Sequence, residues 1–228
     1  MKPLRRIAVV IPARDEQDLL DSCLQALAVA IGNSPLPTRA IVVLDSCGDA
    51  SASICKGHQV ETIEVDFANV GRARHAGISA LQSQAPAEAL WIANTDADSQ
   101  VPPGWLAEQV RLADEGADAV LGLVEVTYES GSPLPWTHHA EYRRRIRANG
   151  SHGHIHGANL GIRASIYLDA GGFPPLSDHE DRELVRRVRA LASSRVVTTT
   201  SLRVKTSGRQ DGRCQDGFAR SIAAAAAP

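Results

Sequence analysis

Apolar residues in the first half of the chain follow two alternating patterns. Short runs of mostly β-branched residues predict strands over residues 7–11, 41–44, 60–65 and 90–93. Between these runs, apolar residues recur at helical spacing over 19–27, and another helix starts near Gly71 and reaches about Gln84. We expect Pro12 to end the first strand. This alternation is typical of βαβ units, so the sequence predicts an α/β fold with a mainly parallel sheet flanked by helices.

The second half of the chain is less regular. The elements predicted there are a strand over 119–126, a helix opened by Pro102-Pro103, a late helix over 184–191, and a strand pair or extended connection over 196–204. Residues 130–153 carry glycine, proline, histidine and arginine, and we interpret them as a partly mobile loop that covers an active site. The alanine run at 223–227 is interpreted as a frayed helix end.

Composition and charge narrow the class of protein. The chain has 228 residues, of which 43% are apolar and 22% charged, as in a soluble globular protein. A formal charge of -2 gives no overall attraction to nucleic acid, so no nucleic-acid partner is expected. The best apolar run, 117–128, is interrupted by Glu125, which argues against a transmembrane segment. Four cysteines without a C-x-x-C pair, and no apolar signal segment, favour a cytoplasmic protein, with peripheral membrane association left open.

Polar residues follow the predicted strands of the first half. They are Arg14-Asp15-Glu16, Asp45-Ser46, Asp66 and Asp96-Ala97-Asp98. In open α/β sheets ligands bind at the carboxyl ends of the strands, so these are the first candidates for a site. The chain has no G-x-G-x-x-G after the first strand and no G-x-x-x-x-G-K-[ST], which argues against a dinucleotide dehydrogenase and a P-loop phosphotransferase.

Asp96 and Asp98 are candidate metal ligands. Two carboxylates one residue apart on a turn can offer hard oxygens to Mg²⁺ or Mn²⁺, while diphosphate oxygens complete the shell. The chain has 15 aspartates, so chance alone supplies about one such triplet. Judged on spacing and position alone, an aspartate that caps the following helix is an equal alternative.

The segment 177–181 (SDHED) enters the late helix. Ser177 and Glu180 match an S-x-x-E capping box, and acidic residues suit a helix N-terminus. That interpretation leaves His179 and Asp181 without a role. A carboxylate at a helix start stays ionised near neutral pH, as a general base must, so Asp181 is a candidate base.

Two basic segments are less specific. His152, His154 and His156 alternate along the chain, after His138-His139, but structural zinc sites usually include cysteine and none is near. A loop that touches substrate is therefore favoured over zinc. The run 143–147 (RRRIR) is favoured as a solvated helix face over a phosphate clamp.

Taken in order, six segments resemble the GT-A fold glycosyltransferases of the family 2 type. They are 9–16 (VVIPARDE), 43–51 (VLDSCGDAS), 69–77 (NVGRARHAG, with His75 where the family has asparagine), 94–98 (NTDAD), 156–159 (HGAN) and 179–184 (HEDREL). The resemblance covers about residues 6–190. Residues 206–209 and 217–219 also resemble the C-terminal ending of small soluble members, without a clear role.

The resemblance implies a role for each matched residue. The residues that would line the nucleotide-sugar are Pro12, Ala13, Arg14, Glu16, Gly71 and Arg74, with Asp45 accepting a hydrogen bond from the base. Asp98, together with Asp96, would bind Mg²⁺ or Mn²⁺. The alternative role for Asp96 is a contact with the donor sugar or ribose in place of the metal. Asp181, paired with Glu180, would deprotonate the acceptor hydroxyl.

The activity implied by the resemblance is transfer of one hexose from a UDP- or GDP-sugar to a small-molecule or lipid-linked acceptor, with inversion. A base in the E-D position favours inversion, although some relatives with similar residues retain configuration. The chain lacks the Q-x-x-R-W motif of processive synthases. We expect a single domain over 1–228, with a nucleotide-sugar half at about 1–100, an acceptor half at about 101–210 and a tail at 211–228. The oligomeric state is not indicated.

Two other functions remain open on the sequence alone. A sugar nucleotidyltransferase shares the architecture but usually carries a G-x-G-T-R-like loop after the first strand, where this chain has residues 12–15 (PARD). A non-catalytic nucleotide-sugar-binding domain would need the donor loops but not Asp181.

Overall fold

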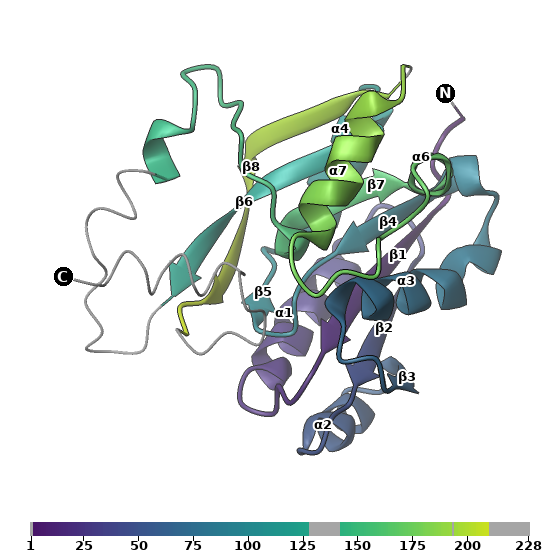
Figure 1. The fold of residues 1–228 in the computed structure, drawn as a ribbon, viewed down its shortest axis with the longest axis vertical. Coiled ribbons are helices and arrows are strands. Elements are labelled where there is room, and N and C mark those ends of the chain that lie inside the picture. Colours follow the sequence, from purple (N-terminus) through teal and green to yellow (C-terminus); the bar gives the residue numbers. More distant parts are fainter. Residues whose placement is uncertain (1, 128–141, 193, 210–228) are drawn as a thin grey trace.

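The structure, a computed structural model, describes residues 2–127, 142–192 and 194–209. Within these ranges the strands form one eight-stranded sheet in the order β3-β2-β1-β4-β7-β6-β8-β5 (Figure 1). Helices pack on both faces of the sheet. The predicted α/β class is therefore confirmed.

The parallel half of the sheet comes from the first part of the chain, as predicted. Its strands are β1 (Arg6–Ala13), β2 (Thr38–Asp45), β3 (Glu61–Val65) and β4 (Leu90–Asn94), and the intervening helices are α1 (Leu20–Gly32), α2 (Ser51–Gly57) and α3 (Val70–Leu81), followed by the 3₁₀ turns η1 (Gln82–Gln84) and η2 (Ala87–Ala89). Pro12 does not end β1, because the strand continues and pairs Pro12 with Val43. β4 pairs with β1 only as far as Val10, so the N–H that proline lacks leaves no bond to β4 unmade.

The other half of the sheet is mixed. Its strands are the short β5 (Ser99–Gln100), β6 (Ala119–Thr127), β7 (Leu160–Arg163) and β8 (Val196–Ser207). β7 runs antiparallel to β4 and β6, β8 is parallel to β6, and β5 is antiparallel to β8. Of the two alternatives predicted over 196–204, the strand pair is wrong, because the segment is extended and β8 is one continuous strand of 12 residues. Its register against β6 shifts between Leu121 and Leu123, and such a bulge bends a strand without ending it.

Two of the three later helices were predicted, and both begin at residues other than those expected. They are α4 (Trp105–Asp114), α6 (Ala164–Asp169) and α7 (Glu180–Ala190), with a 3₁₀ turn η3 (Gly157–Asn159) before β7. Gly104 is the N-cap of α4, so the proline pair precedes the helix and does not form its first turn.

The capping box predicted at 177–181 is also wrong. The N-cap of α7 is His179, which has a left-handed backbone with φ of 61° and makes no side-chain cap bond. The Ser177 hydroxyl instead donates a hydrogen bond to Asp178 at 3.2 Å. Glu180 is the first helical residue and is buried, so the sharp turn at His179 directs acidic side chains into the protein.

Two apolar clusters lie on opposite faces of the sheet. Along β1, Ile7, Val9 and Ile11 belong to the cluster that packs against α1 and α4, whereas Ala8 and Val10 belong to the cluster with α3, α6 and α7. A strand buried on both faces has no room for polar side chains along its length. Polar residues of β1 and β4 are therefore confined to the ends of these strands, and this positions the site.

Some predicted features lie outside the described residues. The predicted loop 130–153 is described only from residue 142 onward, where Ile146 and His152 form an antiparallel bridge. Residues 128–141, which include His138-His139, and residues 210–228, with the alanine run, are not described. Among the helices of the described ranges, none has the length and apolar character needed to cross a membrane.

Candidate functional site

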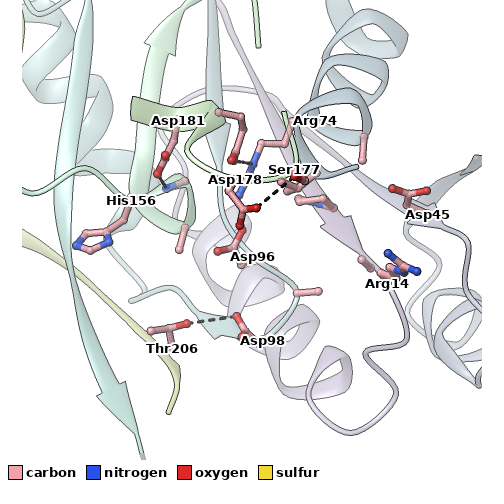
Figure 2. Close-up of a pocket in the computed structure, with 18 of the residues that line it drawn as sticks. Arg14, Asp45, Arg74, Asp96, Asp98, His156, Ser177, Asp178, Asp181 and Thr206 are labelled. Carbon is pink, nitrogen blue, oxygen red and sulfur yellow. Dashed lines mark hydrogen bonds and ion pairs between the residues drawn. The ribbon is translucent and has the colours of Figure 1, made fainter. Parts of the chain in front are cut away.

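A cavity of roughly 290 Å³ opens at the carboxyl ends of β1, β2 and β4. Its wall also includes the start of α7, the turn before η3 and the end of β8 (Figure 2). Three groups predicted from distant parts of the sequence meet here: the loop after β1, the aspartate triplet after β4 and the acidic start of α7. Residues predicted from three separate parts of the sequence therefore line one cavity.

The two aspartates of the triplet face this cavity from one turn. Asp96 accepts a hydrogen bond from the Arg74 guanidinium and forms an ion pair with it. Asp98 accepts hydrogen bonds from the hydroxyls of Ser99 at 3.1 Å and Thr206 at 3.3 Å. Burial, and then the charge of Asp96, raises the pKa of Asp98 to about 6. The alternative helix-capping role does not apply, because α4 begins later and its N-cap is Gly104.

Arg74 joins the aspartate turn to the start of α7. Its side chain is 2% exposed, its Nε donates to Glu180 at 3.2 Å, and its Nη1 donates to the Thr95 carbonyl at 3.4 Å. A Cβ added at Gly157 would lie 2.6 Å from Arg74 Nη2, so the missing side chain of Gly157 makes room for the guanidinium. One buried cation therefore bridges two acidic groups from different parts of the fold.

Glu180 and Asp181 occupy the first turn of α7. Asp181 Oδ2 accepts the Gly157 N–H at 2.8 Å, and Figure 2 shows this carboxylate on the same side of the cavity as His156. Burial raises the pKa of Asp181. Burial raises that of Glu180 to about 7, although Arg74 opposes the shift. Glu180 can therefore take up a proton near neutral pH, and Asp181 does so at a higher pH than an ordinary aspartate.

The loops after β1 and β2 form the opposite wall. Pro12, Ala13, Arg14, Glu16 and Asp45 all line the cavity, as predicted for the nucleotide side. The Asp45 carboxylate also organises its own surroundings. It accepts backbone N–H groups from residues 67 and 68 at 2.7 and 2.8 Å and from residue 69 at 2.9 Å. A bond to a nucleotide base would be made in addition to these.

Gly71 differs from the other predicted donor residues because it does not line the cavity. A Cβ at this position would lie 2.0 Å from the Pro174 carbonyl oxygen and 3.0 Å from that of Leu176. The Gly71 N–H donates to the Leu176 carbonyl at 3.3 Å. Gly71 therefore lets α3 approach the loop that leads to Glu180, and its effect on the site is through that packing.

Arg209 was missed as a site residue. Its two terminal nitrogens donate to both carboxylate oxygens of Glu16, at 2.7 and 2.6 Å, and one of them lies 3.3 Å from Asp98 Oδ2. The resemblance of residues 206–209 to a family ending was the only sequence signal, and it carried no role. Arg182, Asp178 and Ser207 also line the cavity without having been predicted.

The alternating histidines form a ring stack beside the cavity. Tyr142 stacks on His154 with ring centroids 3.8 Å apart, and the Tyr142 hydroxyl lies 3.1 Å from His156 Nε2. Of the three histidines only His156 lines the cavity, and burial lowers its pKa to about 3. Burial also lowers the pKa of His152. His156 is therefore a neutral, positioned part of the wall.

Other candidate metal or anion sites among the described residues have structural explanations. The one group of three with ligand geometry is Asp15, Cys47 and Asp49. Asp15 accepts the Gly48 N–H at 2.7 Å and Asp49 accepts the Gln17 N–H at 2.8 Å, which ties the loops after β1 and β2 together. The arginines of the run 143–147 are exposed, as expected of a solvated segment.

Comparison with known sequences identifies relatives of this chain. The profile of Glycosyl transferase family 2 matches residues 8–169. An undecaprenyl-phosphate 4-deoxy-4-formamido-L-arabinose transferase of Serratia proteamaculans is 28% identical over 123 residues, which are 53% of this chain and 37% of the relative. An uncharacterized glycosyltransferase of Mycobacterium tuberculosis is 29% identical over 116 residues, 51% of this chain and 47% of the relative. The chain thus spans less than half the length of these relatives.

Solved structures share the fold at low sequence identity. The structure of S. aureus TarS 1-349 in complex with UDP-GlcNAc has a TM-score of 0.65 at 14% identity and covers 93% of this chain and 61% of that one. The mannosyltransferase PcManGT from Pyrobaculum calidifontis, in complex with GDP-Man and Mn²⁺, has a TM-score of 0.66 at 18% identity and covers 92% of this chain and 59% of that one. These similarities confirm the GT-A architecture expected from the sequence.

Proposed function

This chain belongs to glycosyl transferase family 2, and from that premise we propose that it moves one hexose from a nucleoside-diphosphate sugar to an acceptor hydroxyl. The observation that carries the proposal is the single cavity that unites the donor-loop residues, the aspartate turn and the acidic start of α7. The structural relatives were solved in complex with UDP-GlcNAc and with GDP-Man, so a UDP- or GDP-sugar is the proposed donor.

The donor would bind along the wall formed by the loops after β1 and β2. Pro12, Ala13 and Arg14 would contact the nucleotide, with Asp45 facing its base. Arg74 would position the donor indirectly, by fixing Asp96 at one end of this wall. The acceptor would enter beside His156 and Asp181, and a small-molecule or lipid-linked hydroxyl compound is the proposed class.

Asp96 and Asp98 are the proposed ligands for Mg²⁺ or Mn²⁺. Both face the cavity from one turn and offer only carboxylate oxygens, which is the ligand type that these hard cations prefer. When bound, the cation would offset the negative charge that builds up on the departing diphosphate. Two hydroxyls hold Asp98 in place, and the Arg74 guanidinium holds Asp96.

Asp181 is the proposed general base. As the acceptor oxygen forms its bond to the anomeric carbon, the proton of the acceptor hydroxyl would pass to the Asp181 carboxylate. The bond from the anomeric carbon to the diphosphate would break, and the nucleoside diphosphate would leave with the electron pair. Attack opposite the leaving group inverts the configuration. The Gly157 N–H bond to Asp181 and the Glu180–Arg74 pair would hold the base in place.

We propose one catalytic domain, with about residues 1–100 serving mainly the donor and about residues 101–210 mainly the acceptor. A cytoplasmic location with peripheral membrane contact fits a lipid-linked acceptor.

The direct test measures what the protein releases from its donor. Purified protein would be incubated with UDP-, GDP-, dTDP- and CDP-sugars, with and without Mn²⁺, and the nucleoside diphosphate would be quantified. Release that depends on Mn²⁺ and on one class of donor is the expected result. Pyrophosphate as product would instead indicate a nucleotidyltransferase, and binding without turnover a binding domain.

Two substitutions separate the proposed roles. Asp98→Asn is expected to abolish Mn²⁺-dependent donor binding. Asp181→Asn is expected to spare binding and lower transfer by about 10²–10⁴-fold, the usual contribution of a positioned base. Glu183→Gln is the matched control, since it removes a carboxylate from the same helix that pairs with Arg186 at 2.7 Å outside the cavity. Unchanged transfer by Asp181→Asn would refute the base assignment.

A further inference from the structure

Arg209 makes a bidentate ion pair inside the proposed donor cavity. Its guanidinium forms a fork with Glu16, at 2.7 and 2.6 Å, and also approaches Asp98 Oδ2 at 3.3 Å. The side chains are 30% exposed for Arg209, 8% for Glu16 and 14% for Asp98. A surface arginine would be mostly in water, so this geometry indicates a cation built into the wall of the cavity.

The backbone fixes Arg209 against the aspartate turn. β5 pairs Ser99 with Thr206 of β8, and the Ser207 N–H donates to the Asp98 carbonyl at 3.2 Å. The Thr206 hydroxyl bonds to the Asp98 carboxylate, as Figure 2 shows. Arg209 follows two residues after β8 ends. Its position relative to Asp98 is therefore set by strand pairing and not by the guanidinium contact alone.

The contact between Arg209 and Asp98 is one of several ion pairs in the cavity. Seven carboxylates and four arginines line the cavity. Arg74 pairs with Asp96 and Glu180, whereas Arg209 pairs with Glu16 and Asp98. A guanidinium stays charged at any accessible pH. A divalent cation that binds Asp98 must therefore share it with Arg209 or displace the guanidinium.

We propose that Arg209 is a donor-binding residue that competes with the divalent cation for Asp98 and binds the donor diphosphate. The inference rests on the proposed function, because it requires a diphosphate ligand. The guanidinium fork that holds Glu16 also matches the spacing of two phosphate oxygens. When the cation binds Asp98, the guanidinium loses this partner, and those of its N–H groups that do not hold Glu16 can contact phosphate. The cation and the nucleotide then strengthen each other's binding, and either alone binds less well.

The test substitutes Arg209→Gln and measures two affinities. Mn²⁺ alone would be titrated by electron paramagnetic resonance, and UDP and GDP would be titrated with Mn²⁺ by calorimetry. We expect Mn²⁺ alone to bind about tenfold tighter to the variant, because its competitor for Asp98 is gone. We expect the nucleotide to bind about tenfold more weakly, because a charge-assisted hydrogen-bond partner is lost. The opposite signs distinguish this role from a loss of structure.

Arg203→Gln is the matched control. Arg203 lies on β8 and pairs with Glu125 at 3.2 Å, but neither residue lines the cavity, so both affinities should be unchanged. Arg209→Lys keeps the charge and serves if Arg209→Gln does not fold. Its Mn²⁺ affinity should stay within about twofold of wild type while its nucleotide affinity falls.

Three results would overturn the inference. If wild type binds nucleotide and transfers sugar, but Arg209→Gln changes neither affinity, only the inference fails. If both affinities fall together in a folded variant, Arg209 is structural. If wild-type protein binds neither UDP nor GDP with Mn²⁺, the proposed function itself fails and the inference fails with it.

Discussion

Replacing Arg74 with methionine would leave a buried carboxylate without its partner. Arg74 is 2% exposed and its partner Glu180 is 8% exposed, whereas Asp96 is 37% exposed and can be solvated by water. Removing one partner of a buried ion pair costs about 3–5 kcal/mol, whereas an exposed partner contributes about 0–1 kcal/mol. We therefore expect Arg74→Met to lower the free energy of unfolding by about 3 kcal/mol. This is the low end of the range for a buried pair, because Glu180 can lose its charge by taking up a proton. For a chain of this size that is a fall in Tm of about 6–12 °C.

The stability lost in Arg74→Met should increase as the pH rises. Burial raises the pKa of Glu180 from 4.5 to about 7 even though Arg74 lowers it, so without Arg74 the pKa rises further. The folded state then prefers the protonated carboxyl more strongly than the unfolded state does. Stability is lost as the pH rises from the unfolded pKa through the folded one. Arg74→Met should therefore be more destabilising at pH 8 than at pH 6.

Urea unfolding followed by circular dichroism at both pH values measures the effect. The double variant Arg74→Met/Glu180→Gln removes both charges, and we expect it to recover most of the lost stability. Arg203→Met removes an exposed arginine and should change the free energy of unfolding by less than about 0.5 kcal/mol. The reasoning is refuted if the double variant is no more stable than Arg74→Met, or if the loss is the same at pH 6 and pH 8.

Three further predictions concern the same cavity. The rate of transfer at saturating donor should fall as the pH drops, with an inflection above the ordinary aspartate pKa of 3.8, because burial raises the pKa of Asp181. In Glu180→Gln the inflection should move to lower pH, because a neighbouring carboxylate is gone, and an inflection near 4 in wild type would contradict the assignment. Gly71→Ala should lower the free energy of unfolding by about 1–3 kcal/mol, because its Cβ would lie 2.0 Å from the Pro174 carbonyl oxygen. An unchanged Tm would show that the loop around Pro174 can move aside without cost. His156 should stay neutral, so its imidazole NMR signals should not titrate between pH 5 and 8; a titration in that range would show that the ring is not buried as described.

The sequence was most informative where strands are buried on both faces. In β1, every residue from Ile7 to Ile11 is apolar and fully buried, so the run of hydrophobic residues defined the strand and placed polar residues at its end. β8 was harder to interpret, because residues 198–201 (TTTS) are partly or fully exposed and interrupt the pattern. The start of α7 was misplaced because Ser177 and Glu180 fit a local rule that the left-handed turn at His179 overrode.

Site residues were likewise predictable where the signal was local in the sequence and not where it depended on contacts between distant residues. Asp96 and Asp98 were predicted because their place after a strand and their spacing are both visible in the sequence. Arg209 could not be assigned a role because its partner Glu16 lies 193 positions away, and the pairing of β5 with β8, which places Arg209 beside the aspartate turn, is not visible in the sequence. Gly71 was taken for a ligand contact, but the Pro174 carbonyl that requires a glycine there belongs to a distant loop.

The order of the strands sets a length requirement on the aspartate turn. β4 and β5 are four strand spacings apart in the sheet, roughly 19 Å if the sheet were flat. The chain from Asn94 to Ser99 reaches at most roughly 18 Å when fully extended, and here it is a tight turn. The sheet must therefore curl until its β5 edge comes close to β4 in its middle, and residues 95–98 connect these two strands directly. Inserting or deleting a residue in this connection would change the curvature of the sheet. The length of the segment is therefore constrained even at positions where the type of side chain is not.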